Sequence, residues 1–216
     1  MSLASAEMKA YYAARAPYYD AVYQKPERAA DIAFLRRHLP ERLGGRELLE
    51  IACGTGFWTQ DLAPAARRMV ATDYTAEPLA FARLRPGVED VQFEQADAYA
   101  LPAQLGQFDA AFAGLWFSHV PKEARAAFLA SLHARLRPGA RVLWIDNHER
   151  QCLDFPLAET DAQGNTYQHR PLRDGSLHRV LKNFPGEDEL QALVAGRASR
   201  SRYLRLDNFW LFEYDL

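Results

Sequence analysis

The feature that most constrains this chain is a short apolar run leading directly into two closely spaced glycines. Residues 47–52 read ELLEIA, and Cys53-Gly54-Thr55-Gly56 follow at once. This pattern is typical of a buried strand that ends in a tight turn. Glycines there let the backbone turn sharply and approach a ligand closely, and a helix beginning at that point presents free N–H groups. The segment therefore predicts a strand–loop–helix unit. Gly-x-Gly is also common in ordinary turns, so the glycines alone are weak evidence for a ligand site.

Strand-like and helix-like segments alternate after this turn. Such alternation implies right-handed crossovers and a parallel sheet covered on both faces. We therefore expect an α/β fold, a three-layer sandwich around a mostly parallel sheet that closes with an antiparallel C-terminal hairpin. The predicted strands are 47–52, 67–72, 91–95, 108–113, 141–145, 202–206 and 209–214, and the predicted helices are 57–65, 76–84, 122–136 and 187–194.

Two segments lie outside the alternation. Residues 1–40 are helical in character, with a break at Pro17 and an end at Pro40. Residues 147–185 are polar, rich in His and Arg, and show no period. We find no linker and no repeat, so 216 residues predict a single domain over 1–216, with an N-terminal helical lid and an irregular insert.

Composition excludes several classes of partner. The charge is nearly balanced, 26 basic against 28 acidic residues, which argues against binding to nucleic acid or an anionic membrane. Cys53 and Cys152 are too few for a disulfide framework or a four-ligand zinc site, so we expect no metal. Residues 1–9 lack the apolar core of a signal peptide, and no run of 18 apolar residues occurs. A cytoplasmic protein is expected, while its oligomeric state stays open.

Polar residues follow successive predicted strands. Asp73 ends the second strand, 17 residues beyond Gly56, where a carboxylate can accept hydrogen bonds from ribose hydroxyls. Asp97 follows the third strand, and Gly114 follows the fourth. Each alone is typical of an ordinary loop or helix cap. Because the carboxyl ends of parallel strands meet at one edge, together they predict a cofactor site there.

At these residues the chain resembles the class I (Rossmann-like) S-adenosylmethionine-dependent methyltransferases of the small-molecule type. The resemblance runs from about Tyr11 to the C-terminus and implies a seven-stranded sheet whose last strand is antiparallel. It implies S-adenosylmethionine (SAM) as cofactor and S-adenosylhomocysteine (SAH) as product. The implied reaction is in-line transfer of a methyl group to an oxygen or nitrogen of a small metabolite, aromatic or anionic.

The same resemblance assigns cofactor contacts. Residues 50–56 would carry the methionine portion, Asp73 the ribose and Asp97 the adenine, while the loop 114–120 would line the methyl-transfer site. Tyr11 and Tyr19 would close over the cofactor from the lid. The full set of expected contacts is Tyr11, Tyr19, Glu50, Ala52, Cys53, Gly54, Gly56, Asp73, Tyr74, Asp97, Ala98 and Gly114.

Position 52 departs from the family pattern, which most often has glycine there. Ala52 fits if its φ is negative and no ligand atom presses on its Cβ. A nicotinamide-type dinucleotide fold is the competing use of such a sheet. That fold expects a third glycine at position 59, where this chain has Thr59.

Catalysis and acceptor binding are predicted from the loop and the insert. His119 is the candidate general base where the acceptor must lose a proton; the alternative is that it caps or packs beneath the next helix. The basic stretch 167–182 predicts that Arg170 or Arg179 meets a carboxylate, phosphate or phenolate. The predicted acceptor contacts are Trp116, Phe117, His148, Arg170 and Arg179.

The sequence also bears on two other functions. The loop Gly114-Leu115-Trp116-Phe117 lacks the Asn/Asp-Pro-Pro-aromatic motif of amino methyltransferases that act on adenine or glutamine, which favours a small-molecule acceptor. A non-catalytic SAM-binding partner or sensor protein is the alternative, because intact cofactor residues do not by themselves demonstrate turnover.

Overall fold

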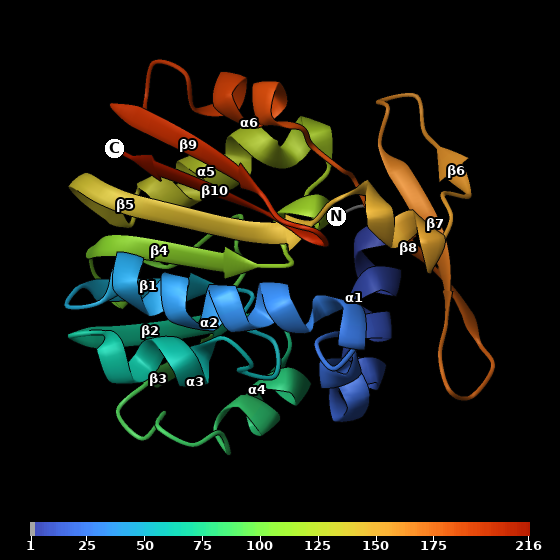
Figure 1. Ribbon diagram of the computed structural model, residues 1–216, viewed down its shortest axis with the longest axis horizontal. Helices are drawn as coiled ribbons and strands as arrows, with labels where there is room; N and C mark the ends of the chain where they lie inside the picture. Colours follow the sequence, from blue (N-terminus) through green and yellow to red (C-terminus); the bar gives the residue numbers. More distant parts are fainter. Residues whose placement is uncertain (1–2) are drawn as a thin grey trace.

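The computed structural model describes residues 3–216, so Met1 and Ser2 of the expected lid lie outside the described residues. Its centre is a seven-stranded sheet in the order β3-β2-β1-β4-β5-β10-β9 (Figure 1). Strands β1 to β5 are parallel, and β10 is antiparallel to both of its neighbours. The predicted α/β fold with its closing hairpin is confirmed. The strands are β1 (Glu47–Ile51), β2 (Arg68–Asp73), β3 (Gln92–Gln95), β4 (Phe108–Gly114), β5 (Leu136–Asn147), β9 (Arg200–Arg205) and β10 (Phe209–Asp215).

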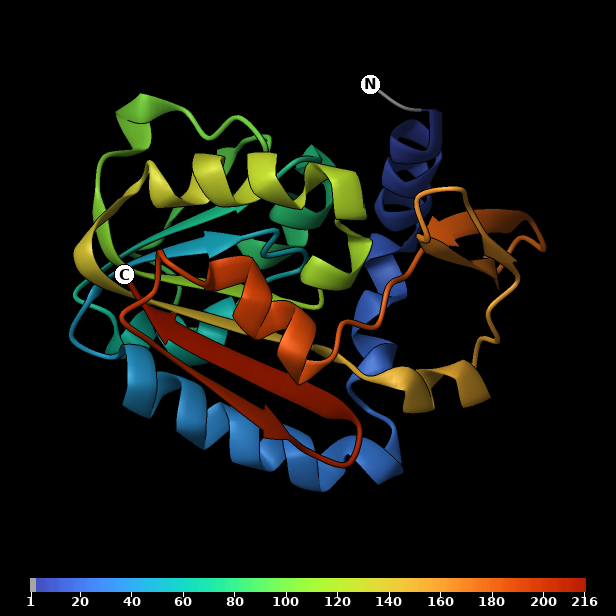
Figure 2. The same cartoon turned by 90° about the horizontal axis from the view of Figure 1, so that it is seen from above.

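Helices cover both faces of this sheet (Figure 2). Leu48 and Leu143 point into one apolar layer with α2, and Leu49 and Trp144 point into the other with α5. This period-2 alternation buries both faces, which is why the strands read as continuous apolar runs. The helices are α1 (Leu3–Arg15), α2 (Ala29–Leu43), α3 (Thr59–Leu62), α4 (Ala76–Ala82), α5 (Arg125–His133) and α6 (Glu187–Val194).

Some element ends differ from the sequence prediction. Helix α2 continues through Pro40 to Leu43, because Leu39 and Leu43 are buried and a proline in the last turn removes only one backbone hydrogen bond. The helix predicted at 57–65 is shorter, since α3 gives way to a 3-10 turn at Ala63–Ala65. Strand β5 is longer than predicted and begins at Leu136, which pairs with Phe108.

The prediction of an irregular insert is wrong. The insert forms a three-stranded antiparallel sheet of β6 (Glu159–Thr160), β7 (Thr166–Pro171) and β8 (Leu177–Leu181). Gln168 and Arg170 of β7 are both buried. Because its inward face carries polar side chains, the strand shows no hydrophobic alternation in the sequence.

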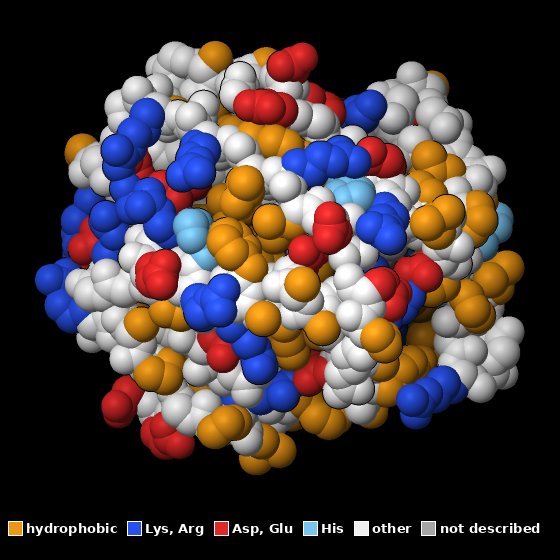
Figure 3. Space-filling model, viewed as in Figure 1, with side chains coloured by type: hydrophobic (Ala, Val, Ile, Leu, Met, Phe, Trp, Pro, Cys, Tyr) orange, Lys and Arg blue, Asp and Glu red, His pale blue; other side chains and the backbone are white. Residues whose placement is uncertain are grey.

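The N-terminal segment and the insert lie together beyond the carboxyl ends of β4 and β5 (Figure 1). Helix α1 contacts β8, and a 3-10 segment, Ala16–Val22, continues from α1. The Arg179 backbone N–H donates to Glu7 at 2.9 Å, which joins the two parts. Within residues 3–216 no helix is long and apolar enough to cross a membrane. Basic and acidic side chains are interspersed over the face shown in Figure 3.

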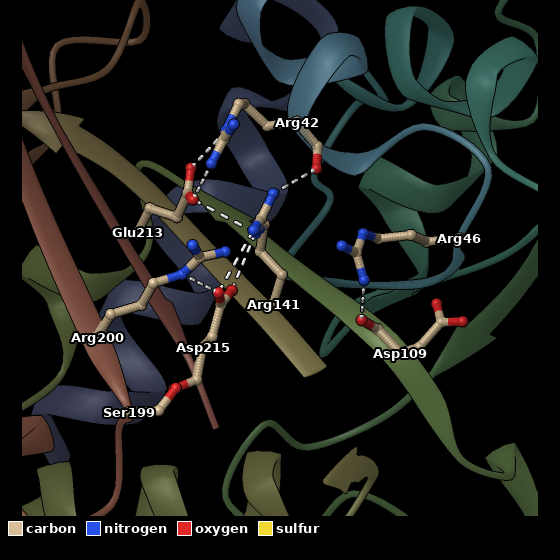
Figure 4. Close-up of polar contacts among 8 residues, drawn as sticks. All are labelled: Arg42, Arg46, Asp109, Arg141, Ser199, Arg200, Glu213 and Asp215. Carbon is tan, nitrogen blue, oxygen red and sulfur yellow. Dashed lines mark hydrogen bonds and ion pairs between the residues drawn. The ribbon is translucent and has the colours of Figure 1, made fainter. Parts of the chain in front are cut away.

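A network of ion pairs lies toward the other end of the sheet (Figure 4). Arg141 of β5 donates to Asp215 at 2.9 Å and lies 3.3 Å from Glu213, both on β10. Arg42 of α2 donates to Glu213 at 2.8 Å, and Arg200 of β9 pairs with Asp215. Arg141 and both acids are buried, so these contacts tie α2, β5, β9 and β10 together.

Candidate active site

The glycine-rich loop joins β1 to α3 and has a left-handed backbone at three positions. Gly54 and Gly56 have φ of +57° and +75°. A Cβ on Gly56 would lie 2.9 Å from the Cα of Ala82, whereas a Cβ on Gly54 would meet no atom within 4 Å. Gly56 is therefore required for packing on α4, and Gly54 leaves open space above the loop for a ligand to approach the backbone.

Ala52 is the third left-handed residue, with φ of +52°. We expected alanine to fit at position 52 if its φ were negative. The observed φ is positive, so this condition is not met. The preceding strand and the turn at Cys53 impose this backbone, since the Cys53 N–H donates to Thr72 at 2.9 Å and its carbonyl accepts from Gly56 at 3.0 Å. An alanine with this backbone lowers the free energy of unfolding by about 1 kcal/mol relative to glycine.

The predicted ribose acid, Asp73, reaches back to the glycine-rich loop. One carboxylate oxygen accepts from the Gly54 N–H at 2.9 Å, and the other accepts from the N–H and hydroxyl of Thr75. Burial raises the pKa of Asp73, which these donors oppose. Asp73 and Gly54, two of the predicted cofactor contacts, are thus brought together.

Glu50 lies beneath the loop and not on its open side. It is 1% exposed and accepts from the Thr59 hydroxyl at 2.6 Å. Burial raises the pKa of Glu50 to about 8, and the nearby charge of Asp73 adds to this effect. Cys53 is also buried, and burial raises the pKa of its thiol well above the ordinary value.

The other predicted cofactor residues follow β2, β3 and β4. Asp97 accepts from the Tyr99 N–H at 2.9 Å, and Ala98 is buried against the core. Tyr74 is partly exposed, with the Lys9 ammonium 3.1 Å from its ring centroid. A Cβ on Gly114 would lie 2.8 Å from Cδ1 of Trp58, so packing alone requires a glycine there.

The N-terminal segment is fastened to the glycine-rich loop. Asp20 accepts from the Thr55 hydroxyl at 2.6 Å and pairs with Arg85, whose Nε donates to the Thr55 carbonyl at 2.9 Å. Tyr11 is 1% exposed and accepts from Arg15 at 3.1 Å. Tyr19 lines a cavity that no residue of the glycine-rich loop borders.

That cavity has a volume of about 160 Å³ and lies among the N-terminal segment, the carboxyl end of β5 and the insert. Leu115 and His119 come to it from the loop after β4. Its charged lining is strongly unbalanced, because five cationic side chains face a single carboxylate. These residues are Arg15, Lys25, Arg28, Arg170 and Lys182, against Asp154.

Arg170 is the most deeply buried arginine of this lining. It is 2% exposed and donates to the side-chain amide oxygen of Gln168 at 2.6 Å and to the Tyr12 hydroxyl at 3.2 Å. Within residues 3–216 no carboxylate lies within ion-pairing distance of its guanidinium. A buried charge without a counter-ion is costly, so an anion placed beside this guanidinium would be stabilised.

Lys182 forms an ion pair with a buried acid, Asp146. Its ammonium donates to Asp146 at 2.7 Å and to the Ser118 hydroxyl at 2.6 Å, and Asp146 also accepts from the Ser118 N–H. Burial lowers the pKa of Lys182 to about 8, although the charge of Asp146 opposes this. A third ammonium hydrogen is left for a ligand in the cavity.

His119 is enclosed by hydrogen bonds on both ring nitrogens. Nδ1 lies 2.5 Å from the Leu181 carbonyl, which can only accept, so Nδ1 carries the proton. Nε2 then accepts from the Tyr12 hydroxyl at 2.9 Å. Burial, with the charges of Lys182 and Arg170, lowers the pKa of His119 to about 3. The ring is neutral here, and its basic nitrogen is occupied.

The other four predicted acceptor residues lie outside the cavity lining. Phe117 stacks on Trp144 in the core at 4.6 Å, and Trp116 packs edge-on against Phe128. His148 caps the 3-10 turn after β5, with Nδ1 accepting from the Arg150 N–H and Nε2 donating to the Asp207 carbonyl. Arg179 donates to Glu159 on the outer side of the insert at 2.7 Å.

Several lining residues were missed in the sequence. Tyr12 and Arg15 were not predicted, although they have the i, i+3 spacing of one helix face, and that spacing was the available signal. Tyr19, predicted as a cofactor contact, lines the same cavity from the following 3-10 segment. Lys182 was counted only as part of a basic stretch. The sequence offers no comparable signal for Asn147 and Gln151, because the β5 end and the following turn are brought to the cavity by the fold.

Comparisons with known proteins agree with this geometry. A family model described as a methyltransferase domain matches residues 48–139. Demethylmenaquinone methyltransferase of Thermus thermophilus is 29% identical over 210 residues, covering 87% of this chain and 90% of that protein. The DhpI–SAM–HEP complex is 31% identical with a TM-score of 0.79, covering 99% of both chains. The DhpI–SAH complex is 30% identical with a TM-score of 0.76, covering 96% of this chain and 94% of that one.

Proposed function

Because this chain belongs to the class I S-adenosylmethionine-dependent methyltransferases, we propose that it methylates an oxyanion oxygen of a small acid. When bound, SAM supplies a methyl carbon made electrophilic by its sulfonium sulfur. The S–CH₃ bond breaks as the O–CH₃ bond forms, SAH leaves as a neutral thioether, and the acceptor loses one negative charge. The chain needs chiefly to orient the acceptor and to exclude water.

The observation that carries this proposal is the buried guanidinium of Arg170, which has no acid partner in the described chain and faces a cavity with four more cations. A carboxylate, phosphate or phosphonate would complete that set. Arg170 offers a planar fork of donors, and Lys182 adds a point charge beside it. An anion held there would also be attracted to the positive sulfonium of the cofactor.

The state of His119 supports the same conclusion. A hydroxyl or ammonium acceptor needs a base, but Nε2 of His119 is occupied by Tyr12 and its pKa is lowered to about 3. An acid acceptor is already ionised near pH 7, so its nucleophilic oxygen needs no base. We therefore assign His119 to holding Tyr12, whose hydroxyl also accepts from Arg170.

The size and polarity of the cavity favour a compact acid. Its volume of about 160 Å³ and its five cations suit an acid of a few heavy atoms better than an apolar quinone. The Thermus thermophilus relative is named for a quinone acceptor, and the difference would lie in the insert and the N-terminal segment. Acceptor identity in this fold is set by such grafted segments.

We assign residues 1–40 to a lid and 147–185 to the acceptor cover of a single domain. The contacts of Asp20 with Thr55 and Arg85 support this, because they join the lid to the loop expected to hold the methionine portion. The open backbone at Gly54 and the carboxylate of Asp73 fit the cofactor there.

The test is methyl transfer from labelled SAM to a panel of carboxylic acids, phosphonates and phosphate monoesters, with neutral phenols and amines beside them. We expect transfer to acids only. Arg170→Met and Lys182→Met should each raise the acceptor KM about tenfold or more while leaving SAH affinity unchanged. Arg179→Met, outside the cavity, is the matched control. Transfer only to phenols or amines, or an unchanged KM in both cavity variants, would refute the proposal.

A further inference from the structure

Asp146, near the carboxyl end of β5, is a buried acid that does not reach the acceptor cavity. Its side chain is 0% exposed and lies outside the cavity lining. A buried carboxylate is costly unless it is paired and accepts hydrogen bonds. Any effect of Asp146 on an acceptor must therefore pass through the groups that it contacts.

The Asp146 carboxylate accepts three hydrogen bonds. Oδ1 accepts from the Lys182 ammonium at 2.7 Å and from the Asn147 N–H at 2.8 Å, and Oδ2 accepts from the Ser118 N–H at 2.9 Å. Burial alone would raise the pKa of Asp146, but the charge of Lys182 and the hydrogen bonds from Lys182 and Ser118 lower it below its ordinary value. The acid is therefore ionised at neutral pH, and the backbone of β5 and of the loop after β4 fixes its position.

The same contacts fix the Lys182 ammonium at the cavity. Lys182 comes from the insert, one residue beyond β8, and donates to Asp146 and, at 2.6 Å, to the Ser118 hydroxyl. The N–H of Asn183 donates to the Ser118 carbonyl at 2.8 Å, which holds the backbone beside it. Two of the three ammonium hydrogens are thus engaged, and the third has a defined direction. Because a free lysine side chain has many rotamers, fixing them in advance lowers the cost of binding an anion.

The charge of Lys182 depends on the same acid. Within residues 3–216, Asp146 is the only carboxylate within ion-pairing distance of Lys182. Burial lowers the pKa of Lys182 to about 8, with Arg170 and Arg28 adding to the effect and Asp146 opposing it. An opposite charge at this distance typically changes a pKa by about 1 to 3. Without Asp146, the ammonium would therefore lose its proton near neutral pH.

The other titratable groups around Lys182 keep one charge state between about pH 6 and pH 9. Burial lowers the pKa of His119 to about 3, and it raises the pKa of Tyr12 and of Cys152 above their ordinary values. Arginine stays protonated in proteins. A pH dependence near 8 therefore reports Lys182. The groups concerned are Tyr12 of α1, Arg28 before α2, His119 after β4, Cys152 after β5 and Arg170 of β7.

We propose that Asp146 is a positioning residue for the acceptor, which fixes the Lys182 ammonium at the cavity and keeps it charged. This inference rests on the proposed function, since it requires that Lys182 binds the acidic end of the acceptor. Asp146 itself takes no part in the transfer of the methyl group. Its loss should weaken anion binding in a way that depends on pH, which a loss of packing alone would not do.

The first measurement is the pKa of Lys182 in the SAH-bound protein. The chain has four lysines, so isotopic labelling of the lysine Cε carbon gives four NMR signals, and Lys182→Met identifies the one from Lys182. The titration midpoint should be about 8 in the wild type. In Asp146→Asn it should be lower by at least about one pH unit.

Asp215→Asn is the matched control. Asp215 is also a buried acid in an ion pair, but it lies with Arg141 toward the other end of the sheet (Figure 4). This variant should lose stability and keep the wild-type midpoint of Lys182. Calorimetric SAH binding reports whether each variant is folded.

The second measurement is the affinity of the SAH-bound protein for sulfate, a compact anion whose charge is constant over this pH range. At pH 8 about half of Lys182 is protonated in the wild type, against about a tenth in Asp146→Asn if the midpoint falls by one pH unit. The loss of sulfate affinity in Asp146→Asn should therefore be about fivefold greater at pH 8 than at pH 6. In a Lys182→Arg background the charge persists, so Asp146→Asn should show no such pH dependence.

Ser118→Ala carries the test should Asp146→Asn fail to fold. It keeps the ion pair and removes only the hydroxyl that accepts from the ammonium. The Lys182 midpoint should fall by about half a pH unit, because a hydrogen bond to the charged form is lost.

The outcomes separate the two proposals. An unchanged Lys182 midpoint in the folded variant, or a loss of sulfate affinity that is equal at pH 6 and pH 8, overturns the positioning role and leaves the anion site standing. No sulfate binding by the wild type, or an affinity unchanged in Lys182→Met, overturns the anion site of the proposed function and the positioning role with it.

Discussion

The Tyr12 hydroxyl lies 2.9 Å from Nε2 of His119, a residue 107 positions later in the chain. Tyr12 comes from the N-terminal segment, and His119 from the loop after β4. Arg170 of the insert donates to the same hydroxyl at 3.2 Å. Three segments that are far apart in the sequence therefore meet at one phenol oxygen, which borders the proposed acceptor cavity.

This arrangement predicts that His119 is dispensable as a base. In His119→Gln, kcat should fall by less than about tenfold, because an ionised acceptor has no proton to remove. Loss of a true general base costs about 100-fold to 10,000-fold. The pH dependence of kcat/KM should show no inflection near 6.5 in the wild type. A 100-fold loss together with such an inflection would restore His119 as the base.

Lys182 predicts an alkaline limit to acceptor binding. Its pKa is lowered to about 8 by burial, with Asp146 opposing and Arg170 reinforcing the shift. The ammonium is charged below that pH and loses its proton above it, so acceptor KM should rise as pH increases through about 8. Lys182→Arg keeps the charge and should move this rise to higher pH. A KM that is constant from pH 7 to 10 in the wild type would contradict the assignment.

Ala52 predicts a stabilising substitution. Ala52→Gly should raise the free energy of unfolding by about 0.5–1 kcal/mol, because φ of +52° strains an alanine and not a glycine. Urea unfolding measures the change. The control is Ala130→Gly, at an exposed position of helix α5, which should lower stability by about 1 kcal/mol. Lower stability in both variants would show that the loop is not strained.

Asp20 predicts a link between the lid and cofactor binding. Asp20→Asn removes the charge that pairs with Arg85 and weakens the contact with Thr55. We expect SAH affinity to fall about threefold to tenfold, measured by calorimetry, because the lid would dock less firmly on the glycine-rich loop. Asp188→Asn on α6, far from the loop, serves as the control. Equal affinities in the wild type and Asp20→Asn would separate the lid from the cofactor.

Glu213 predicts loss of stability in acid. Burial alone would raise the pKa of Glu213. The hydrogen bonds from Arg42 and the charge of Arg141 nevertheless hold this pKa below its ordinary value. The resulting stabilisation is complete above the unfolded pKa of about 4.3 and is lost as the pH falls through the lower folded value. Tm should therefore drop between about pH 5 and pH 3.

Glu213→Gln tests the same contribution (Figure 4). It should lower stability at pH 7 by about 2 kcal/mol, less than the roughly 3–5 kcal/mol of a fully buried pair because Arg42 is partly exposed. It should also make the acid drop in Tm shallower. An unchanged slope against pH would assign the acid sensitivity to other carboxylates.

The central sheet could be predicted because each buried strand appears in the sequence as a short apolar run. Leu48, Leu49, Leu143 and Trp144 are apolar, since both faces of β1 and β5 are buried, and a short apolar run bounded by turn residues is a strand signal. The glycine-rich loop was found in the same way. Its residues need a left-handed backbone or close packing, which restricts residue type at the position itself.

The insert and Ala52 could not be predicted in this way. In β7 the inward positions hold Gln168 and Arg170, so the strand has no hydrophobic period. Ala52 adopts a backbone that its own preference opposes, because hydrogen bonds of Cys53 to Thr72 and Gly56 determine the turn.

The sequence by itself determined the α/β architecture and the position of the glycine-rich loop, because backbone sterics and burial act on neighbouring residues. Only the tertiary structure decided the acceptor site. Tyr12, His119, Asn147, Arg170 and Lys182 come from four separate segments, and their charges and hydrogen bonds depend on distances that no local pattern encodes. The proton on His119 and the unpaired charge of Arg170 follow from those contacts and from burial, which exist only in the folded chain.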